Sequence, residues 1–243
     1  VIGGLLIWLA IKKEMEPTLL LPMGFGAILV NLPWSGAVDQ AYPTGVEHGP
    51  IDVLFNAGIA NELFPLLLFI GIGAMIDFGP LLANPKMMLF GAAAQFGIFF
   101  TLSLARFLGF SLEDAASVAI IGAADGPTSI FVSQYFNSNY IGAIIVAAYS
   151  YMALIPLIQP PIMKLLTTKK ERQVVMAQLR TVSKTEKVCF PIIVTVFVSL
   201  LLPSAAPLIS MLMLGNLLKE SGVVERLVKT ASNELCNIIT IFL

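Results

Sequence analysis

Asp125 is the residue whose type and setting most strongly indicate chemistry, because it lies inside the apolar stretch 115–133. An ionisable side chain in an apolar membrane segment costs about 2.5 to 3.5 kcal/mol on insertion scales and marks by default an ion path, a proton relay or a substrate site. The Gly-Pro pair that follows it breaks the helical pattern. Carbonyls freed at such a break, with Asp125 and the hydroxyls of Thr128 and Ser129, would form an oxygen cage suited to a hard monovalent cation. The alternative is that Asp125 only caps the helix after the break.

Three further polar residues in apolar stretches are weaker candidates. Asp77 has a similar local sequence, but it lies near one end of the stretch 53–82, where a capping or interfacial carboxylate is as reasonable as a role in an ion path. Tyr149 and Tyr151 lie inside the stretch 141–163, whereas the tyrosines of an aromatic belt lie at the rim of a span. At least one of them is therefore expected to need a hydroxyl partner, with packing alone as the alternative.

The composition places these residues in an integral membrane protein. Of the 243 residues 57% are hydrophobic and 12% are charged, and the mean hydropathy is +0.88, whereas soluble domains contain about 25% charged residues. The 14 Lys and Arg nearly balance the 15 Asp and Glu, which argues against a nucleic-acid partner. A single histidine, two separated cysteines and the lack of a phosphate-cradling motif give no indication of a His-based metal site, a disulfide framework or an ATP-driven pump.

Hydropathy predicts membrane spans at residues 18–34, 53–82, 87–108, 115–133, 141–163 and 188–202, followed by a short apolar run at 205–218. The connection 164–187 carries seven of the 14 Lys and Arg and is expected in the cytoplasm, while the acidic connection 35–52 is expected outside. If every predicted span crossed the membrane, the basic connection 164–187 would lie outside instead of in the cytoplasm. The number of crossings is therefore wrong by one. We therefore predict that residues 115–133 enter and leave the membrane on one side. A break in 53–82 at Pro65 is the alternative.

These patterns predict an all-α polytopic membrane protein with broken or re-entrant segments. We expect an N-terminal membrane repeat at 1–163 with its re-entrant segment near 115–133, a basic cytoplasmic loop at 164–187, and the start of a second, inverted repeat at 188–243. Residues 219–235 have the pattern of an interfacial amphipathic helix. The first residue is not Met and the last residues lie in an apolar run, so we expect the chain to be incomplete at both ends.

Several distinctive strings are spread over the whole chain, at residues 16–26, 73–80, 84–86, 91–97, 124–128, 148–154, 156–161, 179–184 and 222–226. Together they resemble the β subunit of the sodium-ion-translocating, biotin-dependent decarboxylases. This family includes enzymes that act on oxaloacetate, methylmalonyl-CoA and glutaconyl-CoA. The resemblance implies a subunit that decarboxylates carboxybiotin and couples CO₂ release and proton uptake to Na⁺ export.

The resemblance also implies a setting and partners. The chain would lie in the bacterial cytoplasmic membrane with a biotin carrier, a carboxyltransferase and a small membrane γ or δ subunit, and the resemblance does not decide whether it forms a homo-oligomer. Biotin itself is not expected on this chain, because no Ala-Met-Lys-Met-type acceptor sequence is present.

Carried over residue by residue, the essential intramembrane Asp of the family falls on Asp125 and its functional Tyr falls on Tyr151. Tyr151 would then relay the proton or orient Asp125 by a hydrogen bond, and it is a further candidate ligand of Na⁺. The family also has an Asn-Pro-x-x-Gly motif, a Ser and an Arg in a later segment that this sequence does not contain. Lys86 is a weak candidate for the cofactor-binding role, since it and the connection 164–187 would supply positive potential toward carboxybiotin. A sodium-coupled carboxylate secondary transporter and an anchoring subunit without chemistry of its own are the alternatives.

Overall fold

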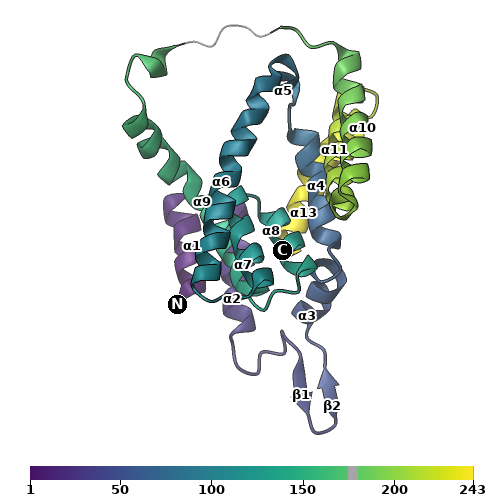
Figure 1. The fold of residues 1–243 in the computed structure, drawn as a ribbon. Coiled ribbons are helices and arrows are strands. Elements are labelled where there is room, and N and C mark those ends of the chain that lie inside the picture. The colour runs from purple at the N-terminus through teal and green to yellow at the C-terminus, as the bar shows by residue number, and fades with distance from the viewer. Residues whose placement is uncertain (175–179, 243) are drawn as a thin grey trace.

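The computed structural model describes residues 1–174 and 180–242, and these are mostly helical (Figure 1). The first half consists of α1 (Ile2–Lys13), α2 (Pro17–Val30), β1 (Gln40–Tyr42), β2 (Gly45–Glu47), α3 (Pro50–Leu54), a π-helical turn (Phe55–Ile59), α4 (Leu63–Met75), α5 (Gly79–Ala83), a 3₁₀ turn (Pro85–Met87) and α6 (Met88–Phe107). Part of the basic connection 164–187 and one end of the string 179–184 lie outside the described residues.

The second half continues with α7 (Leu112–Ala119), a 3₁₀ turn (Ile120–Ala123), α8 (Gly126–Tyr135), α9 (Ile141–Leu166), a 3₁₀ turn (Glu171–Gln173), α10 (Lys184–Leu201), a 3₁₀ turn (Pro203–Ala205), α11 (Ala206–Ser221), α12 (Glu225–Thr230), a π-helical turn (Ala231–Leu235) and α13 (Cys236–Phe242). Figure 1 shows one group of helices that contains α1, α2, α6, α7 and α9 and another that contains α4, α10 and α11. Helices α8 and α13 lie between the two groups, and both contact α4.

One helix among the described residues, Pro85–Phe107, is long and apolar enough to cross a membrane by itself. A second candidate consists of Pro50–Ile59 and Leu63–Met75, which pass the same test together but are bent by 60°. The sequence listed 53–82 as a single span and kept a break in it as the alternative, and the structure has such a break. Pro65 explains it in part, because proline lacks the amide proton that would bond to the carbonyl of residue 61.

A small β-hairpin departs from the all-α expectation. Strands β1 and β2 pair antiparallel, with Gln40 opposite Glu47, in the connection that the sequence placed outside. Asp39 holds the base of this hairpin, because its carboxylate accepts a hydrogen bond from the Gly49 amide at 2.9 Å and lies 2.9 Å from Nδ1 of His48. The hydrogen bond with His48 lowers the pKa of Asp39. The contribution of Asp39 to stability is therefore complete at pH values above the ordinary pKa of an aspartate, and it is lost as the pH falls through the lowered pKa.

The apolar stretch 115–133 folds as a helical hairpin. Helix α7 and the 3₁₀ turn end at Ala124, which has a left-handed backbone with φ of 56°, and α8 then begins at Gly126. The two outer ends of this hairpin meet, because the Ser138 hydroxyl donates to Asp114 at 2.7 Å and the Asn139 amide donates to the same oxygen at 3.1 Å. The chain therefore leaves the hairpin next to the point where it entered.

Helices α4 and α11 approach each other through glycines. A Cβ atom at Gly73 would lie 1.9 Å from the Leu212 carbonyl oxygen, and one at Gly215 would lie 1.9 Å from the Ile70 carbonyl oxygen. Next to this contact, the fully buried amide of Asn216 donates to carbonyls near the end of α4. Only a residue without a side chain allows two helix backbones to come so close.

The amphipathic pattern at 219–235 does not form a single helix. Gly222, with φ of 70°, ends α11, and a short α12 follows. Lys219 belongs to α11, and its ammonium donates to the Ile76 carbonyl at 2.9 Å. The polar side of the expected interfacial helix is thus partly a contact with the carboxyl end of α4.

Cysteine labelling tests the membrane placement of the helical hairpin. If residues 115–133 enter and leave on the outer side, a cysteine in place of Asn137 should react with an impermeant reagent added outside sealed vesicles, as should Ser35→Cys. Lys170→Cys should react only from the cytoplasmic side. Labelling of Asn137→Cys from the cytoplasmic side alone would contradict the prediction.

Candidate functional site

Asp125 lies at the tip of the helical hairpin, where the chain turns into α8. Its carboxylate accepts the Thr128 hydroxyl proton at 2.7 Å and the Thr128 amide at 3.3 Å, so it caps α8. The capping contact that the sequence left open is therefore present. Because an ionised carboxylate offers about four lone-pair sites, these two donors leave acceptor capacity for a cation.

The two hydroxyls of the predicted oxygen cage have different positions. Thr128 bonds the carboxylate itself, and since its proton points to Asp125, its remaining lone pairs stay available. Ser129 is fully buried and its hydroxyl donates to the backbone carbonyl of Asp125 at 2.9 Å. The structure thus brings the three predicted residues together, with Thr128 on the acid group and Ser129 on the backbone behind it.

Tyr149 of α9 lies directly against the break. A Cβ atom at Gly126 would lie 2.7 Å from two carbons of the Tyr149 ring, and the Gly126 amide lies 3.2 Å from the sulfur of Met152. Tyr149 is 3% exposed, and its hydroxyl has no hydrogen-bond partner among the described residues. A buried unpaired hydroxyl costs about 1 to 3 kcal/mol. The Tyr149 ring packs on the residue directly after Asp125, so its unpartnered oxygen suits a cation or a water at the break.

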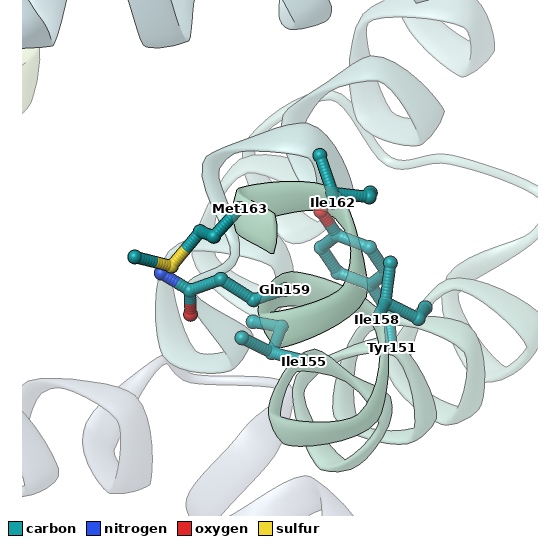
Figure 2. Close-up of a pocket in the computed structure, with 6 residues that line it drawn as sticks. All are labelled: Tyr151, Ile155, Ile158, Gln159, Ile162 and Met163. Carbon is teal, nitrogen blue, oxygen red and sulfur yellow. The ribbon is translucent and has the colours of Figure 1, made fainter. Parts of the chain in front are cut away.

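Tyr151 faces elsewhere, since two residues along a helix differ by about 200° in direction. Its side chain is 39% exposed and lines an open groove of about 290 Å³. The groove follows one face of α9 and is lined by Tyr151, Ile155, Ile158, Gln159, Ile162 and Met163 (Figure 2). The structure brings Tyr149, and not Tyr151, to Asp125.

Asp77 and Lys86 lie outside this cluster. Asp77 lies between α4 and α5, accepts the Gly79 amide at 2.8 Å and lies 3.6 Å from the Lys187 ammonium. Its side chain is more than half exposed. Lys86 is exposed in the 3₁₀ turn before α6. Asp77 has the contacts of a capping carboxylate at a polar junction near the basic connection.

Sequence reasoning missed Asp114, whose carboxylate joins the two ends of the helical hairpin. The contact of Asp114 with Ser111 could have been predicted, because these two residues have the spacing of a capping box at the start of α7. The hydrogen bonds of Asp114 with Ser138 and Asn139 join residues that are 24 and 25 positions apart, and no local sequence pattern predicts them.

Among residues 1–174 and 180–242, no group of three or more His, Cys, Asp or Glu could hold a metal ion. The oxygen atoms at the break come from one carboxylate, neutral hydroxyls and backbone carbonyls. Such ligands suit a hard monovalent cation that is carried through the protein.

Comparison with protein families matches all of residues 1–243 to the Na⁺-transporting oxaloacetate decarboxylase beta subunit. The chain belongs to this family. The resemblance seen in the sequence strings is thereby confirmed, and the oxaloacetate decarboxylase beta family is a family of membrane subunits.

Curated relatives cover all or nearly all of this chain. The methylmalonyl-CoA decarboxylase subunit beta of Veillonella parvula is 54% identical over 242 residues, and the glutaconyl-CoA decarboxylase subunit beta of Acidaminococcus fermentans is 55% identical over 243 residues. Both alignments cover 100% of this chain, which spans 62% of the length of each relative. The oxaloacetate decarboxylase beta chain of Klebsiella pneumoniae is 46% identical over 297 residues, which cover 98% of this chain and 68% of that protein.

The contact between Gly126 and Tyr149 can be tested without any assay of function. Gly126→Ala should lower the free energy of unfolding by about 1 to 3 kcal/mol, because the new methyl group overlaps a buried ring. Gly122→Ala is the matched control, since a Cβ there meets its nearest atoms at an ordinary 3.6 Å. Unfolding of the purified subunit in detergent measures both. Equal effects of the two changes would show that the ring does not pack on Gly126.

Proposed function

We propose that the complete subunit decarboxylates carboxybiotin on a carrier and couples CO₂ release and proton uptake to Na⁺ export, with Asp125 as the coupling carboxylate. The observation that carries this proposal is the half-buried Asp125 at the tip of a broken helical hairpin, beside the buried, unpartnered hydroxyl of Tyr149. Family membership over the whole chain supports it.

The dimensions of the helical hairpin support a position of Asp125 near the middle of the membrane. Helix α8 has ten residues and is therefore about 15 Å long at ~1.5 Å per residue. This is half of the ~30 Å hydrocarbon core of a bilayer. With the Asp114 end at the outer surface of the bacterial cytoplasmic membrane, the tip that carries Asp125 would lie close to the midplane.

At this depth Na⁺ and a proton would compete for Asp125. A carboxylate in a medium of low dielectric constant resists ionisation unless a bound cation offsets the lost hydration. The amino end of α8 adds favourable potential for the ionised form. Na⁺ that enters from the cytoplasm would displace the proton from Asp125, and a later proton would displace Na⁺ outward.

Decarboxylation would consume the released proton. The bond between the ring nitrogen of carboxybiotin and its carboxyl carbon breaks, CO₂ leaves, and the nitrogen keeps the electron pair and takes up the proton. Tyr151, which faces the open groove, is the proposed proton relay. Tyr149 is the proposed oxygen neighbour of the ion.

The carboxybiotin group would reach the site from the cytoplasmic side. There Lys86 and the described part of the connection 164–187 supply positive charge toward its carboxylate. The biotin carrier, the carboxyltransferase and a small γ or δ subunit are the proposed partners, and the carboxyltransferase would select the acid or acyl-CoA.

Transport of ²²Na⁺ tests the proposal. Proteoliposomes that hold the full-length subunit with its partner chains are supplied with a carboxylated biotin carrier. The wild type should move Na⁺ in step with CO₂ release, and Asp125→Asn should lower both by about 100-fold or more, because the competing proton and Na⁺ lose their shared site. Asp77→Asn is the matched control and should keep the ratio of Na⁺ to CO₂.

Three other outcomes would count against parts of the proposal. CO₂ release without Na⁺ movement in Asp125→Asn would confine this residue to the ion path. Unchanged activity in Asp125→Asn would leave it as a helix cap. Uptake of a carboxylate with Na⁺ in the absence of any biotin carrier would instead indicate a secondary transporter.

The roles of Tyr149 and Tyr151 should be distinguished by how strongly Na⁺ protects each variant against thermal unfolding. A ligand that binds only the folded state stabilises it by about 2.7 kcal/mol at 100 times its dissociation constant. Tyr149→Phe removes the hydroxyl beside Asp125 and should raise the Na⁺ concentration for half-maximal thermal protection by about tenfold. Tyr151→Phe should leave this concentration within about twofold while it lowers turnover. A larger shift for Tyr151→Phe would reverse the two assignments.

A further inference from the structure

A second buried carboxylate, Asp114, lies at the opposite end of the helical hairpin from Asp125. It is 6% exposed and accepts hydrogen bonds from the hydroxyls of Ser138 at 2.7 Å and Ser111 at 2.9 Å and from the Asn139 amide at 3.1 Å. No Lys, Arg or His lies within ion-pair distance of it in the described part of the chain. The carboxylate is held by neutral donors alone.

Such an arrangement is unusual for an aspartate in the first turn of a helix, which ordinarily faces water. Burial of a carboxylate is unfavourable unless hydrogen bonds replace its hydration. Here the Ser138 hydroxyl is the main cause that lowers the pKa of Asp114, and the amino end of α7 favours the negative charge as well. The side chain is therefore ionised at neutral pH and its hydrogen bonds are of the strong, charge-assisted kind. We call these contacts of Asp114 with Ser138 and Asn139 the clasp.

An unbroken series of buried hydrogen bonds connects the clasp to Asp125. The Ser129 hydroxyl donates to the Asp125 carbonyl at 2.9 Å, and the Ser133 hydroxyl donates to the Ser129 carbonyl at 2.6 Å. The Ser138 amide then donates to the Ser133 carbonyl at 2.9 Å, and its hydroxyl donates to Asp114. Ser129 and Ser133 are fully buried and Ser138 is 7% exposed. These contacts follow the serine-bearing side of α8 from the tip to the clasp.

We propose that Asp114 is a positioning residue for Na⁺ coupling, which fastens the outer ends of α7 and α8 together and so holds Asp125 and its Thr128 cap in the cation-binding arrangement. This inference rests on the proposed function. It deepens that proposal by naming the group that sets the geometry of the coupling carboxylate. Loss of the clasp would let α8 pivot away from α7, and a pivot at one end of a ~15 Å helix displaces the other end.

The experiment compares Asp114→Asn, Asp114→Ala and Ser138→Ala with Glu113→Gln in the full complex in proteoliposomes. Glu113 is the matched control, because it is exposed in the same helical turn and its change removes the same charge. Carboxybiotin decarboxylation is measured against Na⁺ concentration, and ²²Na⁺ movement is measured per CO₂.

Asp114→Ala and Ser138→Ala should each raise the Na⁺ concentration for half-maximal rate by about tenfold and lower the number of Na⁺ ions moved per CO₂. The double variant Asp114→Ala with Ser138→Ala should be no worse than Asp114→Ala alone, since the bond of the Ser138 hydroxyl is already lost in that variant. Asp114→Asn keeps one acceptor oxygen and should fall between the wild type and Asp114→Ala. Glu113→Gln should match the wild type.

A merely structural role would lower the yield of folded complex or the maximal rate and leave both the half-saturating Na⁺ concentration and the Na⁺ to CO₂ ratio unchanged. That result would overturn the inference. If Asp114→Ala does not fold, Ser138→Ala, which keeps the capping box of α7, decides the question. A wild-type complex that releases CO₂ without moving Na⁺ would instead refute the proposed function.

Discussion

The structure depends on the need of every backbone amide and carbonyl in an apolar environment to find a partner within the protein. An interrupted helix in a membrane is tolerated only where protein or a water-filled cavity covers the break. At the break between α7 and α8 this cover comes from α9, which places the Tyr149 ring on Gly126 and the Met152 sulfur on its amide. The Thr128 amide at the amino end of α8 is satisfied by the Asp125 carboxylate, which also accepts the Thr128 hydroxyl. The need to satisfy the backbone amides at the break therefore also places the Asp125 carboxylate there.

Capping and ion binding are therefore compatible uses of one residue. A capping carboxylate accepts its hydrogen bonds best when it is ionised, and the same negative charge attracts a cation. The amino end of a helix favours negative charge, and in the part of the chain that the structure describes no ion pair joins Asp125 to a cationic side chain. A cation that binds and dissociates can occupy the place beside the carboxylate, and ion transport requires such reversible binding.

Much of the site could be predicted from the sequence because its signals are local. The Gly-Pro pair predicts the interruption, the apolar surroundings single out Asp125, and the spacing to Thr128 follows from the first turn of α8. Which tyrosine meets Asp125 could not be predicted, because the direction of α9 around its own axis is set by its neighbours and not by its sequence alone.

Long-range contacts account for the other differences. The bonds of Asp114 to residues 24 and 25 positions later exist only once α8 has turned back along α7. The division of 219–235 follows from a left-handed glycine and a lysine that finds carbonyls of α4, and no hydrophobic period reports either event. The small strands β1 and β2 lie in a polar connection that gives no alternating pattern.

The glycine contact between α4 and α11 has a mechanical consequence. Two backbones that touch directly have no flexible side chains between them, so neither rotation nor sliding can be absorbed locally, and α4 and α11 must be displaced as one rod. The rod begins at a joint, the 60° bend at residues 60–62. At this joint the Gln134 amide of α8 reaches the Ile59 carbonyl at 3.3 Å. A displacement of α4 and α11 would therefore also displace α8, whose other end carries Asp125.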